Sequence, residues 1–179
     1  KMRDWRSISL WLDQLDEPLV QRPALAASLD VDVAIIGAGY TGLWTAYYLK
    51  QQDPALRIAI VEAEIAGFGA SGRNGGWLMG NMLGEAQLLA GLSAERRQTG
   101  YDLLHGIPDE VGRIIQHEGI DCDYRKGGVL YCAARYPEQL QGLQQQLQAH
   151  RHEGLGEQDY RWLNAAELQP QVRMQHAYA

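Results

Sequence analysis

The strongest chemical signal in the sequence is a glycine pattern followed at a fixed distance by an acidic residue. Residues 37–42 read Gly-Ala-Gly-Tyr-Thr-Gly, and Glu62 lies twenty residues beyond Gly42. The first glycine permits a tight turn, the second lets a pyrophosphate approach the backbone, and the third lets a helix pack against a strand. The N-terminus of that helix offers N–H groups and partial positive charge to phosphates. A carboxylate at Glu62 accepts hydrogen bonds from ribose hydroxyls and repels a 2′-phosphate. The pattern therefore predicts a dinucleotide site that disfavours NADP.

The flanking segments supply the elements that this pattern requires. Residues 31–36 form a short β-branched apolar run, which predicts a strand buried on both faces of a parallel sheet. Residues 43–50 predict a helix that ends at Asp53-Pro54, and residues 57–62 predict a second strand. Together they form a β-α-β unit. The alternative is a glycine turn that merely joins strand to helix, and the distal acid favours the nucleotide site over it.

A second glycine-rich segment helps to distinguish FAD from NAD. Seven of the 20 glycines fall between positions 67 and 84, and residues 67–77 read Gly-Phe-Gly-Ala-Ser-Gly-Arg-Asn-Gly-Gly-Trp. Successive N–H groups in such a loop can form an anion-binding nest. Arg73 could neutralise a phosphate, and Ser71 and Asn74 could bond ribityl or ring atoms. Both cofactors present an ADP half to the first unit, so this second loop favours FAD. A surface loop without a ligand is the alternative.

These segments resemble the FAD-dependent oxidoreductases of the D-amino-acid oxidase and glycine oxidase superfamily. The likeness rests on residues 33–49, on Glu62 and on residues 67–76, and the second loop is most similar to the gamma-glutamylputrescine oxidoreductase branch. The resemblance implies an α/β fold: a Rossmann-like FAD-binding β-α-β core with an incomplete parallel sheet, followed by the start of an α+β substrate domain. It also implies oxidation of the C–N bond of an amine or amino acid by hydride transfer to FAD.

Carried over position by position, the resemblance implies a set of cofactor-binding residues. The ADP half would be held by Gly37, Gly39, Gly42 and Glu62, with Ala38, Tyr40, Thr41 and Ala63 completing that part of the site. The side from pyrophosphate to isoalloxazine would be lined by Gly69, Ala70, Ser71, Arg73, Asn74, Gly75 and Gly76. Neither a catalytic residue nor a metal ligand is predicted.

Two further classes of function stay open: an NAD-dependent dehydrogenase or reductase, and a non-catalytic dinucleotide-binding module. Members of the family are much longer than 179 residues. We therefore expect an N-terminal portion that binds FAD weakly and does not turn over alone. Its exposed sheet edge and apolar faces would associate with the missing C-terminal portion or with a second copy.

Composition limits the other partners. The net charge of −6 argues against nucleic acid, and no apolar run approaches the roughly 18 residues that a membrane span needs. Cys122 and Cys132 are too few and too isolated for a disulfide framework or a zinc site, so we expect reduced, mostly buried thiols in a cytoplasmic protein. The small-molecule substrate, an amine or amino acid, is what the resemblance implies.

We expect three parts along the chain: a lead-in over residues 1–30, a partial FAD-binding domain over 31–120, and the start of a substrate domain over 121–179. Beyond the loops, the pattern predicts one long helix from Ser93 to Glu118 that breaks or kinks at Pro108, strands within residues 124–133, an exposed amphipathic helix over 137–150, and a capping box at 164–167. The five histidines are expected in structural or surface positions.

Overall fold

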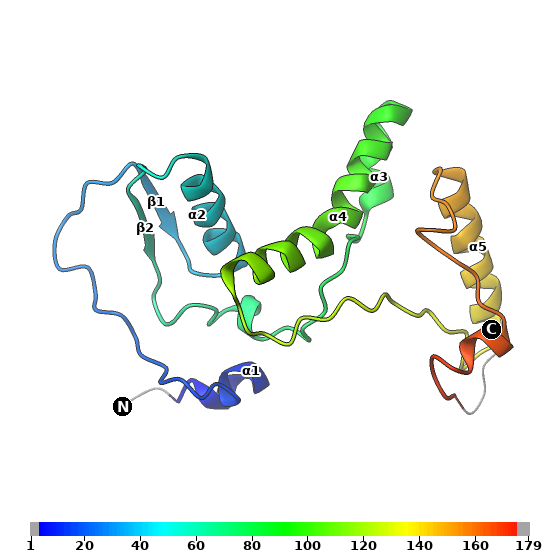
Figure 1. Cartoon of the computed structure of the whole chain (residues 1–179), viewed down its shortest axis with the longest axis horizontal. Coiled ribbons are helices and arrows are strands. Elements are labelled where there is room, and N and C mark those ends of the chain that lie inside the picture. Colours follow the sequence, from blue (N-terminus) through cyan, green and yellow to red (C-terminus); the bar gives the residue numbers. More distant parts are fainter. Residues whose placement is uncertain (1–3, 175–179) are drawn as a thin grey trace. The chain divides into compact units, whose positions relative to one another are not determined.

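The computed structural model describes residues 4–174, and the chain divides into two units between Trp77 and Leu78 (Figure 1). The first unit contains a parallel strand pair with its connecting helix, and the second is helical. The elements of the first unit are η1 (Arg6–Ile8), α1 (Leu10–Asp13), β1 (Val33–Ile36), α2 (Tyr40–Gln52), β2 (Ile58–Val61) and η2 (Ala70–Gly72). Those of the second are α3 (Glu85–Leu89), α4 (Ala94–Glu118), α5 (Glu138–His152) and α6 (Ala165–Leu168).

The β-α-β unit predicted from the sequence is confirmed. β1 pairs with β2 in parallel, with Val33 opposite Ile58, and α2 packs against both strands. An ion pair fixes the start of the sheet, because the Arg57 guanidinium lies 2.9 Å from the Asp32 carboxylate, which also accepts the Arg57 backbone N–H at 2.8 Å. These bonds to Arg57 lower the pKa of Asp32 to about 2, so the carboxylate stays ionised at all ordinary pH values.

The prediction that the first strand is buried on both faces is wrong. Along β1 the residues alternate between half-buried and exposed, and Ile36 is 91% exposed. The apolar run was typical of a central strand in a larger sheet, whereas this sheet has two strands and one packed helix. Alternate side chains of such a sheet face solvent.

Glycine at the start of α2 is a packing requirement. Gly37 turns the chain out of β1 with a φ of +98°, a conformation that favours glycine. A Cβ on Gly42 would lie 2.1 Å from the Gly37 carbonyl oxygen and 3.2 Å from Cγ2 of Ile35. The first turn of the helix therefore lies directly against the preceding turn and the strand.

The long helix of the second unit follows the sequence closely. α4 begins after Ser93, whose Oγ accepts the Arg96 N–H at 3.4 Å, and ends at Gly119 with a φ of +64°. The helix continues through Pro108 without interruption, so the expected break does not occur. The ribbon of α4 instead changes direction along its length (Figure 1), which agrees with the alternative expectation of a kink.

A small aromatic cluster packs the second unit. Leu89, Tyr101 and Leu155 form its buried core, and Tyr160 packs against them. His150 stacks on Tyr160 with ring centroids 3.9 Å apart and planes 7° apart. Nε2 of His150 is buried and has no hydrogen-bond partner among the described residues. This histidine is therefore an aromatic packing group.

Other expectations for the second unit have mixed outcomes. The amphipathic helix is confirmed as α5, and Asn164 and Glu167 form the expected capping box of α6. The strands predicted within residues 124–133 are wrong, since that segment is irregular and finds no partner strand in the part of the chain that is described. Cys122 is exposed and Cys132 half-buried, so the expectation of mostly buried thiols is also wrong. Within residues 4–174, no helix combines the length and apolar character needed to cross a membrane.

The packing at Gly42 generates a stability prediction. Gly42→Ala places a methyl group against the Gly37 carbonyl, so the free energy of unfolding should fall by about 2–3 kcal/mol in urea titrations. Gly106→Ala is the control, because Gly106 lies inside α4 with open space around its Cβ position and should gain about 0.5–1 kcal/mol. Equal free energies of unfolding for the two variants would contradict the close packing of Gly42 against the Gly37 carbonyl.

The cluster around His150 generates a prediction about pH. Burial lowers the pKa of His150; His105 and Arg151 lower it further, and Glu85 opposes them. Because the unfolded chain binds the proton more readily, stability should be constant above the ordinary histidine pKa of about 6.5 and decline as the pH falls toward the lower folded value. His150→Phe should remove most of that decline in urea titrations at pH 7 and pH 5. His117→Gln, at an exposed position of α4, should leave it unchanged.

Candidate functional site

The two glycine-rich loops, residues 37–42 and 67–76, are in direct contact. The N–H of Gly67 donates to the Ala38 carbonyl at 2.9 Å, and the N–H of Tyr40 donates to Oγ of Ser71 at 2.9 Å. The sequence assigns two separate segments to one site. In the structure these segments lie together at the N-terminus of α2.

Each loop contains the same backbone turn. The first glycine has a positive φ in both cases, +98° at Gly37 and +75° at Gly67. In the second loop a Cβ on Gly72 would lie 2.3 Å from the Gly67 carbonyl oxygen, as a Cβ on Gly42 would from that of Gly37. Both turns therefore require glycine at their first and sixth positions, and each leads into a helical turn, at α2 and at η2.

The contact between the loops leaves backbone exposed beside the start of a long helix. A Cβ on Gly39 would lie 2.9 Å from Oγ of Ser71, so a larger residue would crowd this junction. Open space surrounds the Cβ positions of Gly69 and Gly75. The N–H groups of the first turn of α2 have no intrahelical acceptor, and that of Tyr40 already donates to Ser71. The helix dipole adds partial positive charge there. This surface suits an anion that approaches the backbone closely.

Glu62 faces the first loop from the end of β2. Its Oε2 accepts the N–H of Ala38 at 2.8 Å, and its Oε1 accepts the N–H of Glu64 at 3.1 Å. These bonds fix the carboxylate beside the turn that follows β1. An ionised carboxylate has about four acceptor positions, so two backbone bonds leave acceptor capacity for hydroxyl groups of a ligand.

The polar side chains of the second loop bond within that loop. Nδ2 of Asn74 donates to the Ser71 carbonyl at 2.8 Å, and its Oδ1 accepts the N–H of Gly76 at 2.8 Å. Nε of Arg73 donates to the Phe68 carbonyl at 2.8 Å, and the guanidinium lies 4.5 Å from the centre of the Phe68 ring. Asn74 thus braces the loop, and Arg73 carries its positive charge on the exposed side of it.

The lead-in segment contributes contacts that no sequence motif indicates. Nε1 of Trp11 donates to the Asn74 carbonyl at 2.7 Å, and Nε2 of Gln21 donates to the Ala63 carbonyl at 2.8 Å. The sequence predicts only a lead-in for residues 1–30. The one available signal is the presence of two tryptophans in this short stretch.

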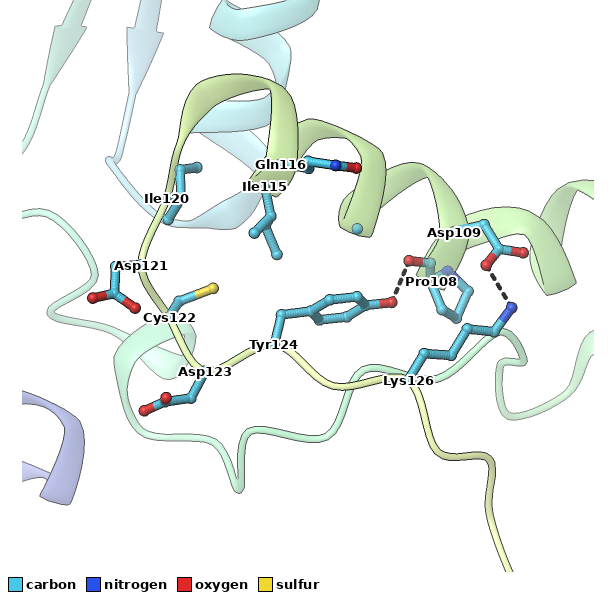
Figure 2. A pocket seen from close by; sticks show the side chains of 11 residues that line it. Pro108, Asp109, Ile115, Gln116, Ile120, Asp121, Cys122, Asp123, Tyr124 and Lys126 are labelled. Carbon is cyan, nitrogen blue, oxygen red and sulfur yellow. Dashed lines mark hydrogen bonds and ion pairs between the residues drawn. The ribbon is translucent and has the colours of Figure 1, made fainter.

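An open hollow of about 580 Å³ in the second unit contains none of the predicted site residues. It lies between α4 and the segment that follows it (Figure 2). The Tyr124 hydroxyl donates to the Pro108 carbonyl at 2.5 Å, and Lys126 pairs with Asp109. These bonds hold the segment against the helix. No group of three or more potential ligand side chains within residues 4–174 could hold a metal ion.

Comparison with known proteins supports the resemblance. Residues 32–179 match the family described as FAD dependent oxidoreductase. The chain is 35% identical to gamma-glutamylputrescine oxidoreductase of Escherichia coli K12 over 129 residues, which cover 68% of this chain and 28% of that protein. It is 31% identical to the probable oxidoreductase OrdL of Haemophilus influenzae over 114 residues, 60% of this chain and 25% of the relative.

The chain thus spans about a quarter of the length of these two curated relatives. No solved structure matches it. The family match covers most of the chain, including both glycine-rich loops and Glu62, and the resemblance to FAD-dependent oxidoreductases is confirmed. The chain therefore belongs to the FAD-dependent oxidoreductase family.

Proposed function

We propose that the two contacting glycine-rich loops of the first unit bind the diphosphate of FAD, the cofactor of this family. The observation that carries the proposal is the hydrogen bond from the Tyr40 N–H to Oγ of Ser71, which joins the second loop to the N-terminus of α2. This bond holds the second loop at the helix end where a phosphate would bind, which a loop that takes no part in binding would not need. The match of both loops to one family supports their use in one site.

The described residues fit such a group. The N–H groups of Thr41 and Gly42 belong to the first turn of α2, where a phosphate is stabilised by hydrogen bonds and by the helix dipole. Gly69 and Gly75 leave room for a ligand against the backbone. Glu62, fixed by the Ala38 N–H, would accept hydroxyl groups of the adenosine ribose. When bound, FAD supplies a hydride acceptor.

For the whole protein we propose oxidation of the C–N bond of an amine or amino acid. The substrate would lose a hydride to FAD and a proton to water and become an imine, which water would hydrolyse to a carbonyl compound and ammonia, or to a carbonyl compound and an amine where the substrate is a secondary amine. The name of the E. coli relative, gamma-glutamylputrescine oxidoreductase, supports an amine substrate. In this scheme the described loops hold and orient the cofactor, while substrate recognition belongs to other parts of the protein.

FAD binding tests the cofactor site directly. Quenching of flavin fluorescence should show saturable binding to the 179-residue chain, and NAD, which shares only the ADP half with FAD, should compete much more weakly than FAD itself. Ser71→Ala removes the acceptor for the Tyr40 N–H and should weaken FAD binding by about 5–10-fold. Thr45→Ala is the matched control, because it removes an exposed hydroxyl that bonds only to the backbone of the same helix.

Competition by NAD as strong as by FAD itself would select the dehydrogenase alternative. Equal affinities of the Ser71→Ala and Thr45→Ala variants would remove the second loop from the site.

The activity proposal needs the full-length gene product. The full-length protein is mixed, in the absence of oxygen, with each member of a panel of primary amines and amino acids. At least one member should abolish the yellow flavin absorbance and be converted to a carbonyl product. A protein whose flavin is bleached by NADH but by no member of the panel would contradict C–N oxidation.

A further inference from the structure

We propose that Trp11 is a positioning residue that fixes the second glycine-rich loop in the form that receives the FAD diphosphate. This inference rests on the proposed function, because it assigns a role to Trp11 only through the loop that would bind the cofactor. Trp11 lies outside both glycine patterns, in a segment for which the sequence predicts no function.

Trp11 touches the second loop in two ways. Its Nε1 donates a hydrogen bond of 2.7 Å to the Asn74 carbonyl. Its ring packs on the backbone at Gly76, where a Cβ would come within 2.9 Å of one ring atom and 3.0 Å of another. Gly76 has a φ of +75°, a backbone conformation that favours glycine, so the indole lies against a turn that other residues rarely adopt.

The contacts continue from Trp11 to the phosphate-binding turn. Asn74, whose carbonyl accepts from Trp11, uses its side chain to bond the Ser71 carbonyl at 2.8 Å. Ser71 in turn accepts the N–H of Tyr40 at the start of α2. A displacement of the Asn74 backbone would therefore move Ser71 relative to the helix N-terminus.

The helix that carries Trp11 is held by its own local bonds. Oγ of Ser9 accepts the Leu12 N–H at 3.2 Å as the N-cap of α1. The guanidinium of Arg6 donates to carbonyl oxygens that follow it, those of Leu12, Asp13, Leu15 and Glu17. α1 lies beside the loop that contains η2 (Figure 1). The local bonds therefore hold the helix from which Trp11 reaches Asn74.

Two more side chains of the lead-in segment reach the chain between β2 and the second loop. Gln21 donates to the Ala63 carbonyl, and Nε1 of Trp5 donates to the Glu64 carboxylate at 3.4 Å. Trp11 is 42% exposed and is not one of the buried core residues, so its removal leaves no enclosed cavity and takes away mainly the contact of the ring with the backbone at Gly76. A change at Trp11 should therefore act on the loop and not on the stability of the whole unit.

Hydrogen exchange and FAD affinity, measured on the same variants of the full chain, test this role. Trp11→Phe keeps a ring but loses the donor, Trp11→Ala loses both, and Leu10→Ala changes an exposed neighbour on the same helix. Without FAD, amides of residues 70–77 should exchange about tenfold faster in Trp11→Ala and about threefold faster in Trp11→Phe, while those of β1 and β2 keep their rates. FAD affinity should fall by similar factors, and Leu10→Ala should match the wild type in both measurements.

The outcomes separate this inference from the proposed function. Wild-type exchange and wild-type FAD affinity in Trp11→Ala, with Ser71→Ala still impaired, overturn the role of Trp11 and leave the cofactor site standing. Faster exchange throughout β1 and β2 overturns it as well, because the residue would then be a structural one. A wild-type chain that binds no FAD overturns both the site and the role of Trp11.

Discussion

The hydrogen bond from the backbone N–H of Tyr40 to the hydroxyl of Ser71 ties the second glycine-rich loop to the start of α2, and the bond from the Gly67 N–H to the Ala38 carbonyl holds the two loops together beside it. Each loop alone is a turn built around glycines at its first and sixth positions, with a carbonyl oxygen occupying the space of a Cβ. Joined, they place two stretches of exposed backbone at the positive end of α2. A Cβ on Gly39 would lie 2.9 Å from Oγ of Ser71, so a side chain there would displace the hydroxyl that joins the loops. Phosphate binding by backbone groups depends on such close approach.

The parts of this site that the sequence predicts are those governed by local geometry. Gly37 and Gly42 are required by one turn and one helix start, and the acidic residue at the end of β2 follows from the register of a β-α-β unit. Caps belong to the same class, because Ser93 and Asn164 act within three residues of their own positions. Interactions of this range can be inferred from spacing alone.

Long-range contacts are the parts that the sequence leaves open. The position of Trp11 in the sequence carries no sign of the loop more than sixty residues away, since a tryptophan between two leucines fits many environments. The stacking of His150 on Tyr160 likewise depends on how the turn after α5 folds back. The strands predicted within residues 124–133 are wrong because local composition was not sufficient. The β-branched and aromatic residues there favour a strand, but a strand also needs a neighbouring strand to pair with, and the segment has none among the described residues.

Binding of one FAD diphosphate by both loops can be followed through the backbone amide signals of the 15N-labelled chain in NMR spectra recorded as FAD is added. If both loops bind the diphosphate, the largest shifts should fall on residues 37–42 and 67–76, the amide of Glu62 should also shift, and all of these signals should give one common dissociation constant. Shifts confined to residues 37–42, or centred on the hollow beside α4, would contradict it.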